Sequence, residues 1–202
     1  MKQRSDISTK LIHFTRGKSY EEAFNTLIKI MRERRLIANN DKIRGGYNCV
    51  CFTEAPIPAL SEFFVEPSFT RYFPFGVMFD KSWIFGQGGR PVIYQPEDEY
   101  EILDKKIRWR HVRYEPNAEN PIDFTWEREW RIKCKEVTFT PSDVIIIVPD
   151  PTWAKYMQEM HQFQQDIELE FYSTIFSLDI VEEFREEFPW RLGTLSLKPL
   201  HL

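Results

Sequence analysis

The chain has 202 residues, of which 42% are hydrophobic, 15% aromatic and 29% charged, with a formal net charge of −4. This makeup is typical of a globular protein of one domain, or two at most, and the charge gives no global reason to expect nucleic-acid binding. Three cysteines without Cys-x-x-Cys spacing argue against a disulfide framework and a zinc site, and no stretch approaches the ~20 apolar residues of a membrane helix, so we expect a cytoplasmic protein without a membrane span.

The first half of the chain predicts short strands around one clear helix. Ser19 and Glu22 form a capping-box pattern, and a helix with one apolar face should run from there to about Leu36. Gly and Pro punctuation and alternating apolar residues indicate the other elements. Strands are expected at residues 10–15, 47–53, 75–79 and 91–94, and a short helix at residues 59–64.

The second half predicts a central strand from Glu129 to Val137 and a strand buried on both faces at residues 143–148. Asp150 should cap a helix that has Pro151 in its first turn and an apolar face of Trp153, Tyr156, Met157 and Met160. A helix near residues 180–188 and a strand near residues 194–198 follow. Because strands and helices do not alternate regularly, we expect a mixed α+β domain.

The densest group of charged and aromatic side chains is residues 126–132, Trp-Glu-Arg-Glu-Trp-Arg-Ile. A strand beginning near Glu129 sends Glu129 and Arg131 to one face and Trp130 to the other, with Glu127 in the preceding loop. A fixed carboxylate with a second one two residues upstream suits stabilisation of a cationic transition state and steering of a nucleophile. The alternative is an edge strand with solvated ion pairs.

A basic stretch interrupts the otherwise acidic chain. Six basic side chains, including Arg108 and Arg110, fall within residues 105–113 and surround Trp109. Cations neutralise phosphates and an interleaved indole can stack on an unpaired base, so Arg108, Trp109 and Arg110 are candidate substrate-binding residues for RNA or single-stranded DNA. The alternative is a solvated loop anchored by Trp109.

Four clusters follow one another along the chain: residues 13–16 (His-Phe-Thr-Arg), 51–54 (Cys-Phe-Thr-Glu), 91–94 (Pro-Val-Ile-Tyr) and 127–129 (Glu-Arg-Glu). Their order resembles that of the mono-ADP-ribosyltransferases, which carry Arg or His on a first strand, an aromatic-Ser/Thr segment on a middle strand and a catalytic Glu on a later strand. Residues 75–94 and 127–132 also resemble bacterial abortive-phage-resistance proteins of the AbiG type. The resemblance implies one ADP-ribosyltransferase-like domain over residues 1–202, with a split mixed or antiparallel β core at about 10–150, flanking helices, and a C-terminal helical and strand extension at 151–202.

The resemblance implies NAD as co-substrate, no metal, and the following roles. Glu129 is catalytic, because cleavage of the nicotinamide–ribose bond builds positive charge on the ribose that a carboxylate stabilises. Glu127 positions the acceptor. His13 and Thr15 bind the ribose or the amide, and Arg16 or Arg131 binds the pyrophosphate. Thr53 belongs to the middle-strand segment, and Phe52 or Tyr94 stacks on nicotinamide. The family often has Arg at the position of His13 and Ser-Thr-Ser at the position of Thr53-Glu54, so the acceptor is left open.

The expected function is therefore an NAD-dependent mono-ADP-ribosyltransferase that acts as an intracellular toxin in anti-phage defence. Its acceptor would be nucleic acid, with RNA favoured, or protein, and an antitoxin partner is compatible with that role. One alternative is a non-catalytic antitoxin or sensor with a degenerate version of the fold. Another is a metal-dependent nuclease that uses Glu54, Glu127 and Glu129. Each site residue also has a purely structural alternative. A role in the core is the alternative for His13, Phe52 and Tyr94, and helix capping is the alternative for Thr53 and Glu54. The alternative for Arg131 is a structural ion pair with Glu127 or Glu54.

Overall fold

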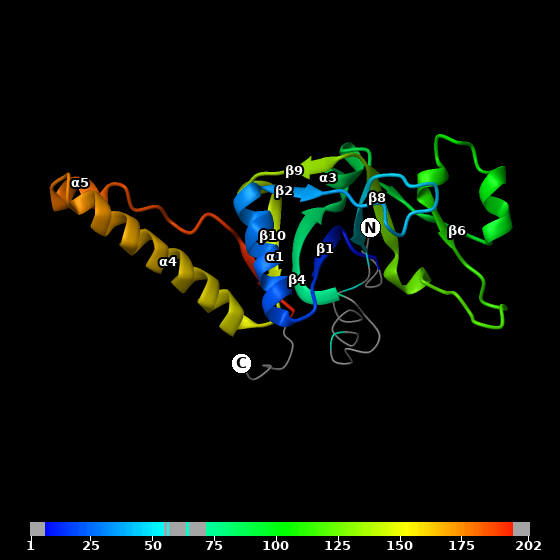
Figure 1. Ribbon diagram of the computed structural model, residues 1–202, viewed down its shortest axis with the longest axis horizontal. Coiled ribbons are helices and arrows are strands. Elements are labelled where there is room, and N and C mark those ends of the chain that lie inside the picture. Colours follow the sequence, from blue (N-terminus) through cyan, green and yellow to red (C-terminus); the bar gives the residue numbers. More distant parts are fainter. Residues whose placement is uncertain (1–6, 55, 57–63, 65–71, 196–202) are drawn as a thin grey trace.

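The computed structural model describes residues 7–54, 56, 64 and 72–195, and it confirms the expected α+β class (Figure 1). A seven-stranded sheet has the strand order β11-β10-β4-β1-β3-β8-β5. All neighbouring strands are antiparallel except β10 and β11, so of the expected mixed or antiparallel arrangements the sheet has a mixed, mostly antiparallel one. Among the helices of the described residues, none is long and apolar enough to cross a lipid bilayer.

The elements of the large sheet and its helices have the following bounds. The strands are β1 (Lys10–Arg16), β3 (Cys49–Thr53), β4 (Tyr72–Asp80), β5 (Arg90–Pro91), β8 (Glu129–Lys133), β10 (Val144–Val148) and β11 (Leu192–Thr194). Two small sheets pair β2 (Arg35–Ile37) with β9 (Glu136–Thr138) and β6 (Ile93–Gln95) with β7 (His111–Arg113). The α-helices are α1 (Tyr20–Glu33), α3 (Lys81–Gly86), α4 (Pro151–Ser173) and α5 (Leu178–Glu182). The 3-10 helices are η1 (Glu97–Ile102), η2 (Arg108–Arg110), η3 (Thr125–Glu127) and η4 (Pro141–Asp143).

Helix α1 follows the sequence closely at its start and ends earlier than expected. The Ser19 hydroxyl accepts the backbone N–H of Glu22 at 3.2 Å, while the Glu22 carboxylate accepts the backbone N–H of Lys18 at 2.8 Å. The helix buries an apolar face against the sheet. Arg34 then adopts a left-handed conformation with φ of 52°, which ends the helix and sends Leu36 into β2.

Two predicted strands are interrupted by pairing with other parts of the chain. The strand expected from Glu129 to Val137 is wrong as one element, because β8 ends at Lys133 and β9 pairs with β2 in a separate sheet. The strand expected at residues 91–94 is also divided: β5 pairs with β8, whereas β6 pairs with β7. Pro91 has no backbone N–H, and the N–H of Val92 bonds to the carbonyl of Glu129, so the ladder stops there.

In the C-terminal part, the buried strand and the start of the long helix are as expected, whereas the last helix and the last strand have other bounds. Strand β10 is buried along most of its length, and Asp150 caps α4 through the N–H groups of Thr152 and Trp153, as expected. The helix expected at residues 180–188 is shorter, since α5 ends at Glu182. The final strand lies earlier than expected and pairs in parallel with β10. The helix expected at residues 59–64 lies outside the described residues apart from Phe64, and residues 196–198 of the expected last strand also lie outside them.

Helix α4 leaves the body of the molecule after its first turns (Figure 1). Trp153 and Met157 are buried in the main core, but Tyr156 and Met160 from the same predicted apolar face are exposed. The 23 residues of α4 span about 35 Å at 1.5 Å a residue, so its second half, together with α5, forms an arm beside the sheet.

Candidate active site

The large sheet is open between β1 and β3. These two strands, which are described in full, pair only at Ile12 and Thr53. A cavity of about 290 Å³ occupies the opening. Its walls come from both strands, from the segment after β2 and from the loop before β8, and include residues 12–16, 37, 39, 41–43, 49–53, Thr26, Phe64, Tyr72, Trp126, Glu127 and Glu129.

The opening explains how residues from both faces of the sheet line one cavity. Ile12, Thr53 and Glu129 are register partners across three adjacent strands, so their side chains share one face. Strand alternation puts His13 and Phe52 on the other face, where their rings are 6.0 Å apart. Because β1 and β3 do not pair beyond Ile12, all these side chains reach the same cavity.

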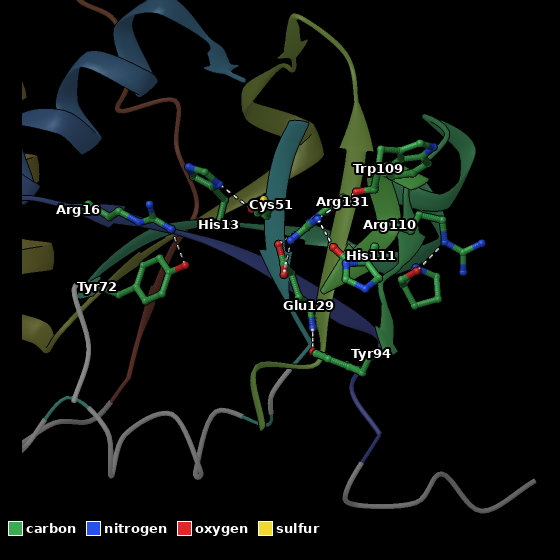
Figure 2. Close-up of polar contacts among 11 residues, drawn as sticks. His13, Arg16, Cys51, Tyr72, Tyr94, Trp109, Arg110, His111, Glu129 and Arg131 are labelled. Atoms are coloured by element: carbon green, nitrogen blue, oxygen red, sulfur yellow. Dashed lines mark hydrogen bonds and ion pairs between the residues drawn. The ribbon is translucent and has the colours of Figure 1, made fainter. Parts of the chain in front are cut away.

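Glu129 is held in place by Arg131, two residues along β8 (Figure 2). The guanidinium donates to both carboxylate oxygens, with Nε–Oε1 at 2.8 Å and Nη2–Oε2 at 3.0 Å. The third nitrogen, Nη1, donates to the carbonyls of Trp109 at 2.9 Å and His111 at 3.0 Å. A planar fork bound at all three nitrogens leaves the carboxylate little freedom to rotate.

The ion pair of Glu129 and Arg131 is largely shielded from solvent. Arg131 is buried, and burial alone would lower its pKa, but the Glu129 carboxylate outweighs burial and raises it. The phenol oxygen of Tyr94 accepts the backbone N–H of Glu129 at 3.1 Å, and burial raises the pKa of Tyr94 to about 12. Burial also raises the pKa of Cys51, beside Glu129, so its thiol is neutral. Among the described residues, the Glu129 carboxylate is therefore the one charged group that forms an ion pair with the guanidinium.

Glu127 sits at the end of turn η3, at the cavity wall. Arg128 takes a left-handed conformation with φ of 45° that separates the turn from β8, and the Thr53 hydroxyl donates to the carbonyl of Glu127 at 2.5 Å. Burial and the nearby Glu129 carboxylate raise the pKa of Glu127 to about 7, although Arg16 opposes this. The two carboxyl groups therefore differ: Glu129 has a bound guanidinium, and Glu127 exchanges a proton near neutral pH.

His13 spans the opening between the strands (Figure 2). Its Nδ1 lies 2.8 Å from the carbonyl oxygen of Cys51. Burial lowers the pKa of His13, so the ring is neutral at pH 7. Since a carbonyl only accepts hydrogen bonds, Nδ1 carries the proton, and Nε2 is left as an acceptor.

Arg16 and Thr15 complete the β1 side of the site. Arg16 is exposed, donates to the Tyr72 phenol oxygen at 2.7 Å, and lies 4.7 Å from the centre of that ring. Arg16 therefore places a positive charge at the cavity. Among the described residues, no carboxylate lies within hydrogen-bond distance of its guanidinium. The Thr15 hydroxyl is buried and donates to the carbonyl of Phe75 at 3.2 Å. Thr15 thus also ties β1 to β4.

Three predicted ligand contacts need correction. Arg131 and Tyr94 do not line the cavity; both hold Glu129 from behind. Arg131 is therefore not placed to bind a pyrophosphate, and its expected structural partner, Glu127 or Glu54, is replaced by Glu129. Phe52 does line the cavity, but its ring is packed in the core between His13 and Phe79. It forms wall rather than a stacking platform.

The interpretation of Trp109 as a base-stacking residue is also wrong. Its indole is buried beside Ile43 and Cys49 and donates to the carbonyl of Lys106 at 2.9 Å. Arg108 is bound to Glu101 at 2.7 Å and Arg110 to the carbonyl of Pro91 at 2.8 Å. These three side chains hold the small β6–β7 unit together and lie outside the cavity.

Sequence reasoning missed part of the cavity wall. Trp126, Tyr72 and Lys42 line it, as do Asn39 and Asp41. Trp126 directly precedes the Glu-x-Glu motif, which is a usable signal. The polar run from Asn39 to Lys42 signals a loop but not its position, and no local pattern marks Tyr72.

The metal-dependent nuclease alternative lacks a common site for its three carboxylates. Glu54 accepts Lys81 Nζ at 2.5 Å and Trp130 Nε1 at 2.7 Å, and Trp130 points to the face of β8 opposite Glu129. Glu54 does not line the cavity that holds Glu127 and Glu129. Within the described ranges, no three His, Cys, Asp or Glu side chains are grouped as metal ligands would be.

Compared with known proteins, the chain matches no family model, no curated protein and no solved structure.

Proposed function

We propose that the chain is an NAD-dependent mono-ADP-ribosyltransferase that acts as an intracellular toxin in anti-phage defence. The observation that supports this most is the cavity in the opened sheet, where His13, Arg16 and Glu129 line one space although they come from strands over a hundred residues apart. The order of the clusters at residues 13–16, 51–54 and 127–129, which resembles that of the mono-ADP-ribosyltransferases, supports the same function.

The chemistry of the groups at the cavity supports NAD as the co-substrate. A carboxylate accepts hydrogen bonds from ribose hydroxyls and stabilises positive charge on the ribose. The Nε2 atom of a neutral His13 accepts from a hydroxyl or from the amide nitrogen of nicotinamide. Arg16 offers a cation for the pyrophosphate. No metal is needed for this chemistry.

The reaction proceeds by loss of nicotinamide and attack of an acceptor on the same carbon. As the bond between ribose C1′ and the nicotinamide nitrogen breaks, nicotinamide leaves with the bonding electrons, and Glu129 stabilises the positive charge that develops on the ribose. The acceptor's hydroxyl or amine then bonds to C1′ and gives its proton to Glu127, which is deprotonated above about pH 7. Arg131 and Tyr94 are positioning residues that hold Glu129.

The acceptor is proposed to be nucleic acid, with RNA favoured, or protein. With Arg108, Trp109 and Arg110 committed to internal contacts, the support from the basic stretch narrows to exposed side chains such as Lys105 and Lys106. An antitoxin that blocks the cavity would be a partner of such an enzyme.

The experiment combines labelled NAD with total RNA, single-stranded DNA or cell protein and follows transfer of the label to each acceptor. We expect label on one of them, and growth arrest when the chain is expressed. Glu129→Ala should abolish both at unchanged expression, while Glu136→Ala on β9 is the matched control and should keep both. Label on no acceptor, together with free growth, would favour the non-catalytic antitoxin or sensor.

A further inference from the structure

Helix α4, whose second half belongs to the arm, carries an exposed apolar stripe that the proposed reaction does not use. Five large side chains recur at helical spacing along one face of α4, and Phe163 and Phe171 are 68% and 65% exposed. The members of the stripe are Tyr156, Met160, Phe163, Ile167 and Phe171. Helix α5 and the segment after it cover other residues of α4, because Gln165 bonds to Glu186 and Arg185 to Asp166.

We propose that this stripe is the interface of a homodimer in which the α4 helices of two copies pair antiparallel. A two-fold axis between positions 163 and 164 puts Tyr156 opposite Phe171 and Met160 opposite Ile167, and it brings the two Phe163 rings together. The stripe is thus complementary to itself. At its ends the aromatic rings of Tyr156 and Phe171 face each other, and between them the flexible Met160 faces the branched Ile167. A parallel pairing would instead place each stripe residue opposite its own copy, with Phe163 facing Phe163 in one layer and Phe171 facing Phe171 in another.

The exposed area agrees with a dimer. About half of each of five side chains, at roughly 200 Å² for a large one, gives about 500 Å² of apolar surface per copy. Two copies together reach about 1,000 Å², the lower limit of a specific interface. A single chain has no such reason to expose phenylalanines on a projecting helix.

The charges along the stripe are compatible with this arrangement. The chain from α4 to the segment after α5 is acidic, with nine acidic and two basic residues between positions 155 and 187. Two acids beside the stripe are already paired, Glu159 with Lys155 at 3.3 Å and Asp166 with Arg185 at 2.8 Å. In the antiparallel register Lys155 also comes next to Glu170 of the second copy, once at each end. The cavity-lining residues of the proposed active site include none from α4 or α5, so pairing leaves the cavity open.

The first test is the mass of the purified full chain in solution, by sedimentation equilibrium between about 1 and 100 μM. We expect twice the chain mass of 24.3 kDa for the wild type and 24.3 kDa for Phe163→Glu. Ile102→Glu is the control, because Ile102 is 80% exposed outside the arm and should leave the dimer intact. A monomer at every concentration, or a dimer that survives Phe163→Glu, would overturn the proposal, and a cooperative melt of Phe163→Glu at the wild-type temperature shows that the variant is folded.

A second test reads the orientation of the helices with a short bismaleimide. Gln164→Cys lies at the proposed axis and should cross-link to its copy, whereas Ser173→Cys should not, because helix geometry separates the two copies of position 173 by about 28 Å. The wild type measures any background from Cys49, Cys51 and Cys134. Equal cross-linking at positions 164 and 173 would contradict antiparallel pairing.

Activity of the Phe163→Glu variant is expected to equal that of the wild type, so failure of the dimer and failure of the proposed enzyme are told apart.

Discussion

At the scale of single residues, the contact between Glu129 and Arg131 organises the candidate site. A buried guanidinium bound at all three nitrogens fixes a carboxylate whose other side meets the cavity. The fork also links β8 to the carbonyls of residues 109 and 111, so the same side chain supports both the site and the β6–β7 unit. Loss of one partner leaves the other as an uncompensated buried charge.

Arg131→Lys is expected to reduce both catalysis and stability, because a lysine keeps the charge but not the planar fork. We expect kcat for nicotinamide release to fall at least tenfold with KM within about twofold, and the free energy of unfolding to fall by about 1–3 kcal/mol. Arg35→Lys, at a half-exposed ion pair with Glu33 and Glu136, is the matched control and should change stability by less than about 1 kcal/mol. Rates and urea melts of the two variants check this, and equal behaviour of both would contradict it.

Glu127 gives the site a pH dependence with a definite sign. Burial, and then Glu129, raises its pKa from 4.5 to about 7, so between these values the folded chain holds a proton that the unfolded chain has lost. The stability that the raised pKa contributes is complete below about pH 4.5 and is lost as the pH rises through about 7.

In Glu127→Gln this titration is absent. We therefore compare the free energy of unfolding of the wild type with that of the variant at each pH. The difference, wild type minus variant, should decrease by about 2 kcal/mol between pH 4.5 and pH 8. Transfer to an acceptor should rise with pH around 7 in the wild type and lose that limb in the variant. Urea melts and rates across this range test both points, and parallel pH profiles of the two proteins would refute them.

At the scale of elements, local patterns predicted the starts of α1 and α4 and the strands β1, β3, β4 and β10, but not the boundaries that depend on distant contacts. The start of α1 could be predicted because Ser19 and Glu22 provide cap and partner within four residues. The break between β8 and β9 could not, because it depends on contacts with distant strands: β8 pairs with β3, and β9 pairs with β2. The division of residues 91–94 had a local signal in Pro91, which cannot continue a central ladder.

Helix α4 should depend on its cap. The buried Asp150 carboxylate accepts the N–H of Thr152 at 2.7 Å and that of Trp153 at 3.3 Å. Asp150→Ala is expected to lower the free energy of unfolding by about 1–2 kcal/mol and the melting temperature by a few degrees. Asp150→Asn keeps the accepting oxygen and should lose less than half as much. Calorimetry distinguishes these outcomes, and equal losses in the two variants would show that charge rather than capping matters.

At the scale of the whole molecule, the order of motifs predicted more of the site than any one motif did. His13, Thr53 and Glu129 could be associated from the sequence because they lie on β1, β3 and β8, which are neighbours in the sheet. The opening between β1 and β3 leaves no local trace, so the sequence gives no sign that His13 and Glu129 meet from opposite faces. The arm was equally hidden, since Tyr156 and Met160 have the same helical spacing as the buried Trp153 and Met157.

The catalytic role of Glu129 is measured most directly by the rate at which the purified chain releases nicotinamide from NAD. The rate is compared with and without acceptor for the wild type, Glu129→Gln and Glu136→Gln. The wild type and the Glu136→Gln control should release nicotinamide at equal rates, and Glu129→Gln should be at least 100-fold slower although it melts cooperatively. No release by the wild type with RNA, DNA or cell protein present, or equal rates for Glu129→Gln and the wild type, would show that the chain is not a transferase that uses Glu129.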